Sequence, residues 1–290
     1  MGFSCIASLS ASSDDTCSPQ KDLRRVLQEI AVTDKKLGRK SNDQRRFIVV
    51  EGLYKNSGTI VPFDELAALK HEFKYRLILD ESFSFGTLGK TGKGVMELYD
   101  KKQMYDAEII TISLENSLGS VGGVTVGNEE VVDHQRLSGA GYCFSASSPP
   151  FTASAATCAL EQLKTEPDLI ARLKRNTEYM QNKLRVDMGT LVPDMIKITS
   201  DPRSPMVFLE LAGTERECDY DEQVRLLDMI VECCLSAGVA AVSAGHHVGS
   251  NQKTHTAPAI KLTLSAAHTE SDIDQALATL KRSALTVLKK

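Results

Sequence analysis

The sequence predicts an α/β fold with a parallel or mixed sheet, and three observations support that class. Short apolar runs bounded by charged residues recur in the first half of the chain, as in strands buried on both faces. Segments with helical spacing of apolar residues lie between these runs, which gives the strand–helix–strand order of an α/β domain. The 290 residues are 42% hydrophobic and 25% charged, which suits a globular chain with a large and a small domain.

The first half of the chain supplies most of the predicted sheet. Apolar residues at helical spacing, with charges between them, predict a first helix over residues 21–37. Four consecutive apolar residues at 47–50 predict a strand, and a second buried run ends in acid at Asp80. The predicted strands are 47–50, 76–80, 107–112 and 121–126, with a helix over 62–74 and further helix in much of 151–188.

From residue 206 onward the pattern changes to a smaller α+β arrangement. Strands are predicted at 206–211, 239–243 and 260–264, with helices over 221–236 and 271–288. The Ser-rich segment 1–22 shows no sustained period and is predicted to be a disordered, unrelated start. The predicted organisation is therefore this start, a large domain over 23–165 and a small C-terminal domain over 166–290.

Composition excludes several classes of function. Lys and Arg number 34 against 38 Asp and Glu, so no net basic field would attract nucleic acid or anionic lipid. No uncharged apolar run is long enough to cross a membrane. Seven cysteines without a Cys-x-x-Cys pair indicate reduced thiols in a cytosol-facing compartment. His246, His247 and His255 have no carboxylate or thiol at ligand spacing, so no metal site is predicted.

The most informative single residue is Asp80, at the carboxyl end of a predicted buried strand. Ligands of open α/β sheets bind in the crevice at the carboxyl ends of strands. A carboxylate there could pair with a protonated ring nitrogen such as the pyridinium of pyridoxal phosphate. Spacing alone favours a simpler role, an acid that caps a loop.

Several longer motifs resemble one family of enzymes. The run LDESFSFGTLGKTGKG at 79–94 resembles the aspartate loop of α-oxoamine synthases, the pyridoxal-phosphate acyltransferases of the aspartate-aminotransferase fold (fold type I). Within that family, the runs at 45–52, 114–123 and 134–150 resemble first long-chain-base subunits of serine palmitoyltransferase. The resemblance extends over 21–290 and weakens after 165. It implies a partial large domain of aspartate-aminotransferase type with a C-terminal α+β small domain.

Two departures from the family pattern fall at positions of catalytic chemistry. Alignment on the Gly122–Gly123 pair places Asn116 where catalytic members carry the Schiff-base lysine. An amide cannot form an imine with the pyridoxal aldehyde. Phe83 stands where the catalytic loop carries a histidine, whereas Asp80 is retained. The resemblance thus implies a chain without catalytic residues of its own.

The resemblance also implies a function. Serine palmitoyltransferase condenses L-serine with a long-chain acyl-CoA to 3-oxosphinganine, the first step of sphingolipid synthesis, and this chain would be its supporting subunit in a heterodimer. The lysine-bearing catalytic subunit would hold pyridoxal phosphate covalently. Besides Asp80, the candidates for facing that cofactor are Val124, Thr125, Ser145 and Ser147. Turn capping before two prolines is the alternative for the two serines. Lys90 and Lys93 lie on a glycine turn and are predicted to be surface residues.

Length and location complete these expectations. The family's large domain normally begins earlier and includes a membrane anchor, so the chain is expected to be N-terminally truncated. Its expected location is the cytosolic face of the endoplasmic reticulum, where partners alone would hold it, and otherwise the cytoplasm.

Two alternative functions stay open. One is an independent pyridoxal-phosphate acyltransferase (an aminoketone synthase) that uses a displaced lysine, and the other is a non-enzymatic α/β interaction module.

Overall fold

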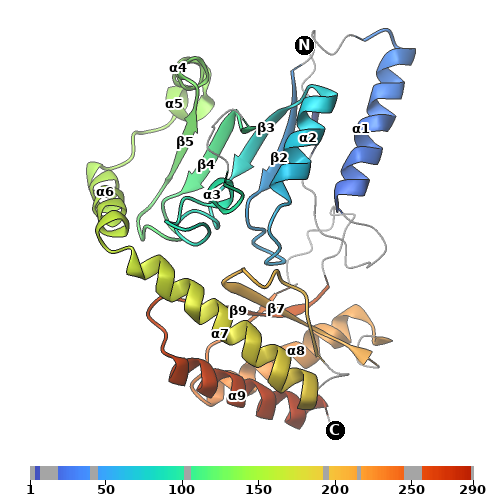
Figure 1. The fold of residues 1–290 in the computed structure, drawn as a ribbon, viewed down its shortest axis with the longest axis vertical. Coiled ribbons are helices and arrows are strands. Elements are labelled where there is room, and N and C mark those ends of the chain that lie inside the picture. The colour runs from blue at the N-terminus through green and yellow to red at the C-terminus, as the bar shows by residue number, and fades with distance from the viewer. Residues whose placement is uncertain are drawn as a thin grey trace. The chain divides into compact units, whose positions relative to one another are not determined.

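The structure is a computed structural model that describes residues 4–6, 19–39, 45–100, 106–191, 196–213, 217–244 and 257–288. The chain divides into two compact units. The first unit contains residues 1–54 and 60–167, and the second contains 55–59 and 168–290. Figure 1 shows the elements of both, and each unit is described by itself below.

The first unit is built on a five-stranded sheet in the order β1-β2-β3-β4-β5. Its strands are β1 (Ser4–Ile6), β2 (Arg46–Glu51), β3 (Arg76–Asp80), β4 (Ile109–Ser113) and β5 (Gly123–Gly127). Strands β1 to β4 pair in parallel, and β5 pairs antiparallel with β4. The prediction of a mixed sheet in an α/β arrangement is therefore confirmed, and alternating side chains of β2 and β3 are buried.

Six helices of the described residues belong to the first unit. They are α1 (Pro19–Lys36), α2 (Phe63–Phe73), α3 (Val95–Leu98), α4 (Glu129–Ser138), α5 (Ala140–Phe144) and α6 (Pro150–Thr165). Helix α2 forms because Phe63, Leu66 and Leu69 recur at helical spacing and are buried. It ends at Lys74, whose left-handed conformation (φ 56°) closes the C-terminus. Helices α4 and α5 were not predicted, and neither has a buried residue.

A buried ion pair joins helix α2 to the loop before β4. Lys70 Nζ lies 2.7 Å from Glu108 Oε1 and donates a hydrogen bond of 3.0 Å to the Asp106 carbonyl oxygen. Glu108 Oε2 in turn accepts the N–H of Leu77 at the start of β3, at 2.6 Å. The lysine side chain is only 3% exposed, so its charge is compensated almost entirely by protein groups.

In its described residues, the second unit packs three helices on a four-stranded antiparallel sheet in the order β6-β7-β9-β8. Its elements are α7 (Asp168–Leu191), β6 (Ile196–Ile198), β7 (Met206–Leu211), α8 (Tyr220–Ser236), β8 (Val242–Ala244), β9 (Ala259–Thr263) and α9 (Glu270–Leu288). One apolar core includes Leu184 of α7, Leu209 of β7, Ile230 of α8, Ile260 of β9 and Ala284 of α9. The predicted α+β character of this part of the chain is confirmed.

A short segment early in the chain belongs to this second unit. Residues 55–59 pack against it, and the N–H of Asp201 donates to the Gly58 carbonyl oxygen at 3.2 Å. Gly58 has φ +66°, and a Cβ there would lie 2.5 Å from the carbonyl oxygen of Met206. Only glycine therefore fits this position without displacement of the backbone.

Two parts of the sequence-based expectation differ from the structure or fall outside it. Within the segment 1–22, expected to lack regular structure, residues 4–6 form a strand that pairs with β2, and α1 begins at Pro19. Backbone pairing along the sheet edge stabilises so short a strand, which no side-chain period reveals. The histidines 246, 247 and 255 lie outside the described residues.

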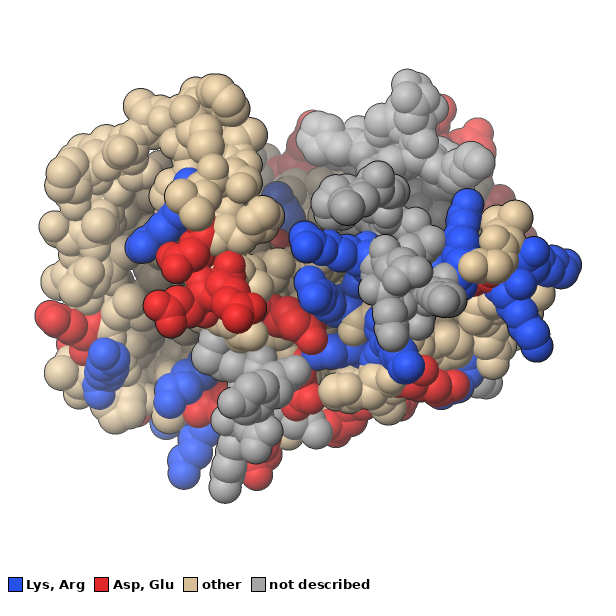
Figure 2. Space-filling model, turned by 90° about the horizontal axis from the view of Figure 1, so that it is seen from above, with Lys and Arg blue, Asp and Glu red and all other residues tan. Residues whose placement is uncertain are grey.

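Surface charge and helix hydropathy bear on the possible partners. The face in Figure 2 carries both acidic and basic side chains, with an acidic group near the centre of the view and basic side chains around it. Among the helices of the described ranges, none combines the length and apolar character that a membrane crossing requires.

Candidate functional site

The candidate site lies where β3 and β4 end and β5 begins. Because β5 runs antiparallel to β4, its first residues lie at the same edge of the sheet as the carboxyl ends of the parallel strands. Asp80 of β3 is paired with Thr111 of β4, and Thr111 is paired with Thr125 of β5. Directly paired residues project from the same face of a sheet, so these three polar side chains form one row.

A shallow cavity of about 430 Å³ opens at this row. It is lined by Asp80, Ser82, Thr111, Ile112, Ser113, Gly122, Gly123, Val124 and Thr125. Three of the residues proposed from the sequence, Asp80, Val124 and Thr125, are therefore brought together. Sequence reasoning missed Ser82, Thr111 and Ser113. The available signal was a threonine within the apolar run 109–112, followed by a serine at the end of the strand.

Ser82 holds the floor of this site together. Its N–H donates to Asp80 Oδ1 at 2.8 Å, and its Oγ accepts the N–H of Ser113 at 3.0 Å. Its carbonyl oxygen accepts a 2.8 Å hydrogen bond from Asn116 Nδ2. The loop after β3 is thus tied to the end of β4 and to the turn that follows it. These bonds fix the Asp80 carboxylate at the cavity wall.

The positions of Asn116 and of the nearby lysines show which nucleophilic groups the described residues bring to the cavity. Asn116 is exposed, and its amide is engaged with the backbone of Ser82. Lys90 and Lys93 are exposed on the glycine turn, as predicted. No lysine is among the described residues that line the cavity. The cavity therefore presents a carboxylate and hydroxyls, but no amine from these residues.

Beneath the site lies a buried acid that the sequence analysis did not single out. Glu81 is 2% exposed and accepts hydrogen bonds from the N–H groups of Val95 and Met96 and from the Ser84 hydroxyl. Burial raises the pKa of its carboxyl group, although these hydrogen bonds oppose the rise. The glycine-rich turn that ends at Gly94 packs directly against this carboxylate. A Cβ on Gly94 would lie 2.4 Å from Glu81 Oε2, so no side chain fits there.

The two remaining candidates, Ser145 and Ser147, lie after α5 on an exposed segment. The Ser145 hydroxyl donates to the carbonyl oxygen of Gly141 in the preceding helix, which is a local capping contact. The structure does not bring either serine into the cavity lining. Their assignment to a cofactor phosphate stays a prediction, and turn capping is the role that the contacts of Ser145 support.

The donor set of the cavity fits one part of pyridoxal phosphate. The Asp80 carboxylate is an acceptor suited to a protonated ring nitrogen, and the hydroxyls of Thr125, Thr111 and Ser113 suit a phosphate or a phenolic oxygen. The aldehyde would need an amine, which the lining residues lack. The residues present thus fit the cofactor's ring and polar substituents.

Comparison with known proteins identifies the family. The Aminotransferase class I and II family matches residues 22–280. "Long chain base biosynthesis protein 1b" of Oryza sativa subsp. japonica is 40% identical over 265 residues, which are 90% of this chain and 53% of that protein. "Serine palmitoyltransferase 1" of Dictyostelium discoideum is 36% identical over 269 residues, 92% of this chain and 54% of that protein. The chain therefore spans about half the length of these curated relatives.

Solved structures agree on the fold. A serine palmitoyltransferase variant from S. paucimobilis, solved with a bound PLP–myriocin adduct, superposes with a TM-score of 0.71 at 24% identity. The match covers 89% of this chain and 59% of that chain. At this identity the similarity shows the fold alone, and it is the fold of type I pyridoxal-phosphate enzymes, as the sequence predicted. The family match over residues 22–280 shows that the chain belongs to the aminotransferase class I and II family.

Proposed function

We propose that this chain is a supporting subunit of serine palmitoyltransferase, the enzyme that condenses L-serine with a long-chain acyl-CoA to give 3-oxosphinganine. Relatives named long chain base biosynthesis protein 1 and serine palmitoyltransferase 1 support this assignment over most of the chain. In this proposal the chain forms a heterodimer with a lysine-bearing catalytic subunit, which holds the cofactor covalently.

The observation that carries the proposal is the state of Asn116. Its side chain is an amide at the position that the resemblance assigns to the Schiff-base lysine, and it is hydrogen-bonded to the Ser82 carbonyl oxygen beside Asp80. An amide nitrogen is not basic, so it cannot capture an aldehyde. A family-like site with an acid in place and the amine replaced is what a non-catalytic partner would present.

The remaining residues of the cavity would complete a pocket that another polypeptide supplies with an amine. When bound, pyridoxal phosphate supplies an electron sink for carbanion chemistry. Asp80 would accept a hydrogen bond from a protonated ring nitrogen, and Thr125 with the backbone at Val124 would face the phosphate. Ser82 and Asn116 would keep the Asp80 carboxylate fixed through the hydrogen bonds described above.

The proposed location follows from the proposed partner. A serine palmitoyltransferase complex that takes long-chain acyl-CoA would operate at a lipid surface, and we place it at the cytosolic face of the endoplasmic reticulum. This chain would then be held at the membrane by its partner.

A reduction experiment tests the missing amine directly. The purified chain is incubated with pyridoxal phosphate, reduced with borohydride, digested and examined by mass spectrometry, beside the variant Asn116→Lys. We expect no reduced adduct on any residue that lines the cavity in the natural chain, and a new stoichiometric adduct at position 116 of the variant; partial labelling of the exposed Lys90 and Lys93 is not an active-site adduct. A stoichiometric adduct on an active-site residue of the natural chain would overturn the proposal and favour an independent acyltransferase.

Co-expression tests the partnership. The full chain is produced with and without a lysine-bearing serine palmitoyltransferase subunit, and 3-oxosphinganine formation is measured. We expect product only from the co-purified pair. Turnover by this chain alone would identify an independent aminoketone synthase, and failure to co-purify would favour a non-enzymatic interaction module.

A further inference from the structure

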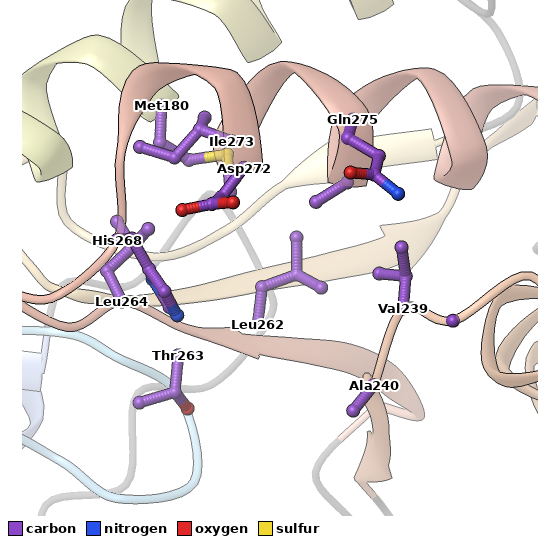
Figure 3. Close-up of a pocket in the computed structure, with 12 residues that line it drawn as sticks. Met180, Val239, Ala240, Leu262, Thr263, Leu264, His268, Asp272, Ile273 and Gln275 are labelled. Carbon is purple, nitrogen blue, oxygen red and sulfur yellow. The ribbon is translucent and has the colours of Figure 1, made fainter.

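A second cavity, unrelated to the site at Asp80, lies within the second unit. It has a volume of about 280 Å³ and opens between strand β9, the segment before β8 and helix α9 (Figure 3). Its lining comprises Met180, Gly238, Val239, Ala240, Leu262, Thr263, Leu264, His268, Asp272, Ile273, Gln275 and Ala276. We call this cavity the α9 pocket.

The α9 pocket exists because two strands part. Strand β8 pairs with β9 only from Val242, opposite Lys261, to Ala244, opposite Ala259. The preceding residues 238–240 and the following residues 262–264 face each other across the pocket instead of forming further rungs of the ladder (Figure 3). A gap of this kind leaves side chains of the underlying core accessible to a ligand.

The pocket floor is apolar. Leu262, Leu264, Ile273 and Met180 line it, and all four are buried members of the core of the second unit. Figure 3 shows Leu262 in the middle of the floor and Val239 toward the opposite end from His268. An alkyl chain laid from one end to the other would therefore lie on apolar carbon along its length.

One end of the pocket is polar and carries a negative charge. Asp272 Oδ2 accepts hydrogen bonds from the N–H and the hydroxyl of Thr269, each at 2.8 Å, and these bonds lower the pKa of the carboxyl group. Oδ1 has no hydrogen-bond partner within the described part of the chain. The carboxylate is therefore ionised at neutral pH, with one oxygen available to a ligand.

His268 stands beside this carboxylate and offers a donor. Its Nδ1 accepts the N–H of Ser265 at 3.2 Å, so the neutral ring carries its proton on Nε2. Figure 3 shows the His268 ring and the Asp272 carboxylate at the same end of the pocket. A negatively charged carboxylate and a hydrogen-bond donor thus lie side by side at one end of the apolar floor.

These features select one class of ligand. The Asp272 carboxylate favours an ammonium group and disfavours an anion. Asp272 and Thr269 also form a reciprocal capping box at the start of α9, in which the N–H of each residue donates to the side chain of the other. The His268 Nε2–H suits a hydroxyl or carbonyl oxygen next to that ammonium. The apolar floor suits an alkyl chain. An amine with a neighbouring oxygen and an aliphatic tail meets all three requirements.

We propose that the α9 pocket binds a long-chain amine of this kind, an amphiphile whose head carries an ammonium and a neighbouring hydroxyl or carbonyl oxygen. The preference for a cationic amphiphile comes from the pocket alone. The physiological source rests on the proposed function, because the amino ketone made by serine palmitoyltransferase belongs to this chemical class. The pocket would then allow the supporting subunit to sense the product of the complex.

Calorimetric titration of the full chain with three eight-carbon probes tests the charge preference. Octylamine, octanol and octyl sulfate share one tail and differ in the charge of the head. We expect octylamine to bind at least tenfold more tightly than octanol, and octyl sulfate not to bind. Equal affinity for octyl sulfate and octylamine would overturn the proposal.

Three variants locate the site. Asp272→Asn should weaken octylamine binding at least tenfold and leave octanol binding unchanged. Asp274→Asn is the matched control, since Asp274 lies on the same helix but contacts Tyr179 and Lys183 outside the lining, and its affinity should equal that of the natural chain. Ala276→Phe fills the pocket and should abolish binding of every probe. If Ala276→Phe retained the octylamine affinity of the natural chain, the ligand would bind elsewhere and the proposal would be wrong.

These results do not depend on catalysis. The binding tests use this chain alone, so a pair that makes no 3-oxosphinganine would refute the proposed function and leave the pocket's ligand class standing. Conversely, an active pair whose supporting subunit binds no amine would refute the pocket alone.

Discussion

Asp80 and Thr125 lie on one row of the sheet, separated by Thr111 alone, although 45 positions divide them along the chain. The row exists because β5 reverses direction after the turn at 116–118 and returns along β4. A strand parallel to β4 would have placed residue 125 away from the carboxyl end of β3. The antiparallel direction of β5 therefore brings Thr125 to the same edge of the sheet as Asp80.

Thr125→Val tests the contribution of this row to the proposed complex. The substitution keeps the branched shape that suits a strand and removes the hydroxyl. We expect the co-purified pair to require about tenfold more pyridoxal phosphate for half-maximal activity, the size of one lost hydrogen bond to a charged group. Val126→Thr, on the opposite face of β5, is the matched control and should leave that concentration unchanged. An unchanged value for Thr125→Val would remove Thr125 from the cofactor's surroundings.

Gly94→Ala tests the closure of the glycine turn on Glu81. Gly94 has φ +91°, and a Cβ would lie 2.4 Å from Glu81 Oε2, so backbone strain and a clash act together. We expect the free energy of unfolding to fall by about 3 kcal/mol. Gly119→Ala is the milder comparison, because Gly119 has φ +60° with nothing within 4 Å, whereas Gly94 combines the clash with φ 91° and ψ −160°, a conformation nearly restricted to glycine; Gly119→Ala should cost about 1 kcal/mol. Urea denaturation followed by circular dichroism measures both, and equal losses would contradict the clash.

Glu81→Gln tests the pH dependence that burial imposes. Because the folded-state pKa of Glu81 is raised above 4.5, the folded chain keeps its proton over a pH range in which the unfolded chain has released it. Stability from this group is therefore complete below pH 4.5 and is lost as the pH rises through the folded-state pKa. The stability of the natural chain relative to Glu81→Gln should fall over that window and then level off. Urea midpoints compared from about pH 4.5 to pH 8 check this, and a difference that rises with pH would contradict it.

Elements with a strong burial pattern were predictable from the sequence, and those without one were not. Strand β3 was predicted with its observed bounds because three apolar residues stand between Arg76 and Asp80. Strand β6 is three residues long, which is too short to show a period. Helices α4 and α5 were missed because no apolar side chain of either is buried, and Leu137 and Phe144 are 80% and 89% exposed.

The candidate site was predictable in part for a related reason. Asp80 ends a buried run, so its place at a strand end follows from the pattern, whereas Ser82 and Ser113 enter the site through strand register and turn geometry. Register depends on pairing between distant segments, which one sequence does not display. The α9 pocket was not predicted at all, because it results from the place where β8 leaves β9.

Lys70→Met tests whether the buried ion pair under α2 contributes to stability. Methionine keeps the length of the side chain, but Glu108, with 27% of its side chain exposed, would lose its buried counter-charge. We expect a loss of about 2 kcal/mol, less than for a fully buried carboxylate, because water reaches one side of Glu108. The exposed pair of Arg25 and Glu29, 2.8 Å apart on α1, is the control, and Glu29→Gln should leave the stability nearly unchanged. Urea midpoints at low and high salt distinguish the two pairs, since salt screens the exposed pair and leaves the buried one nearly unaffected. A gain in stability for Lys70→Met would mean that desolvation of the lysine outweighs its attraction to Glu108.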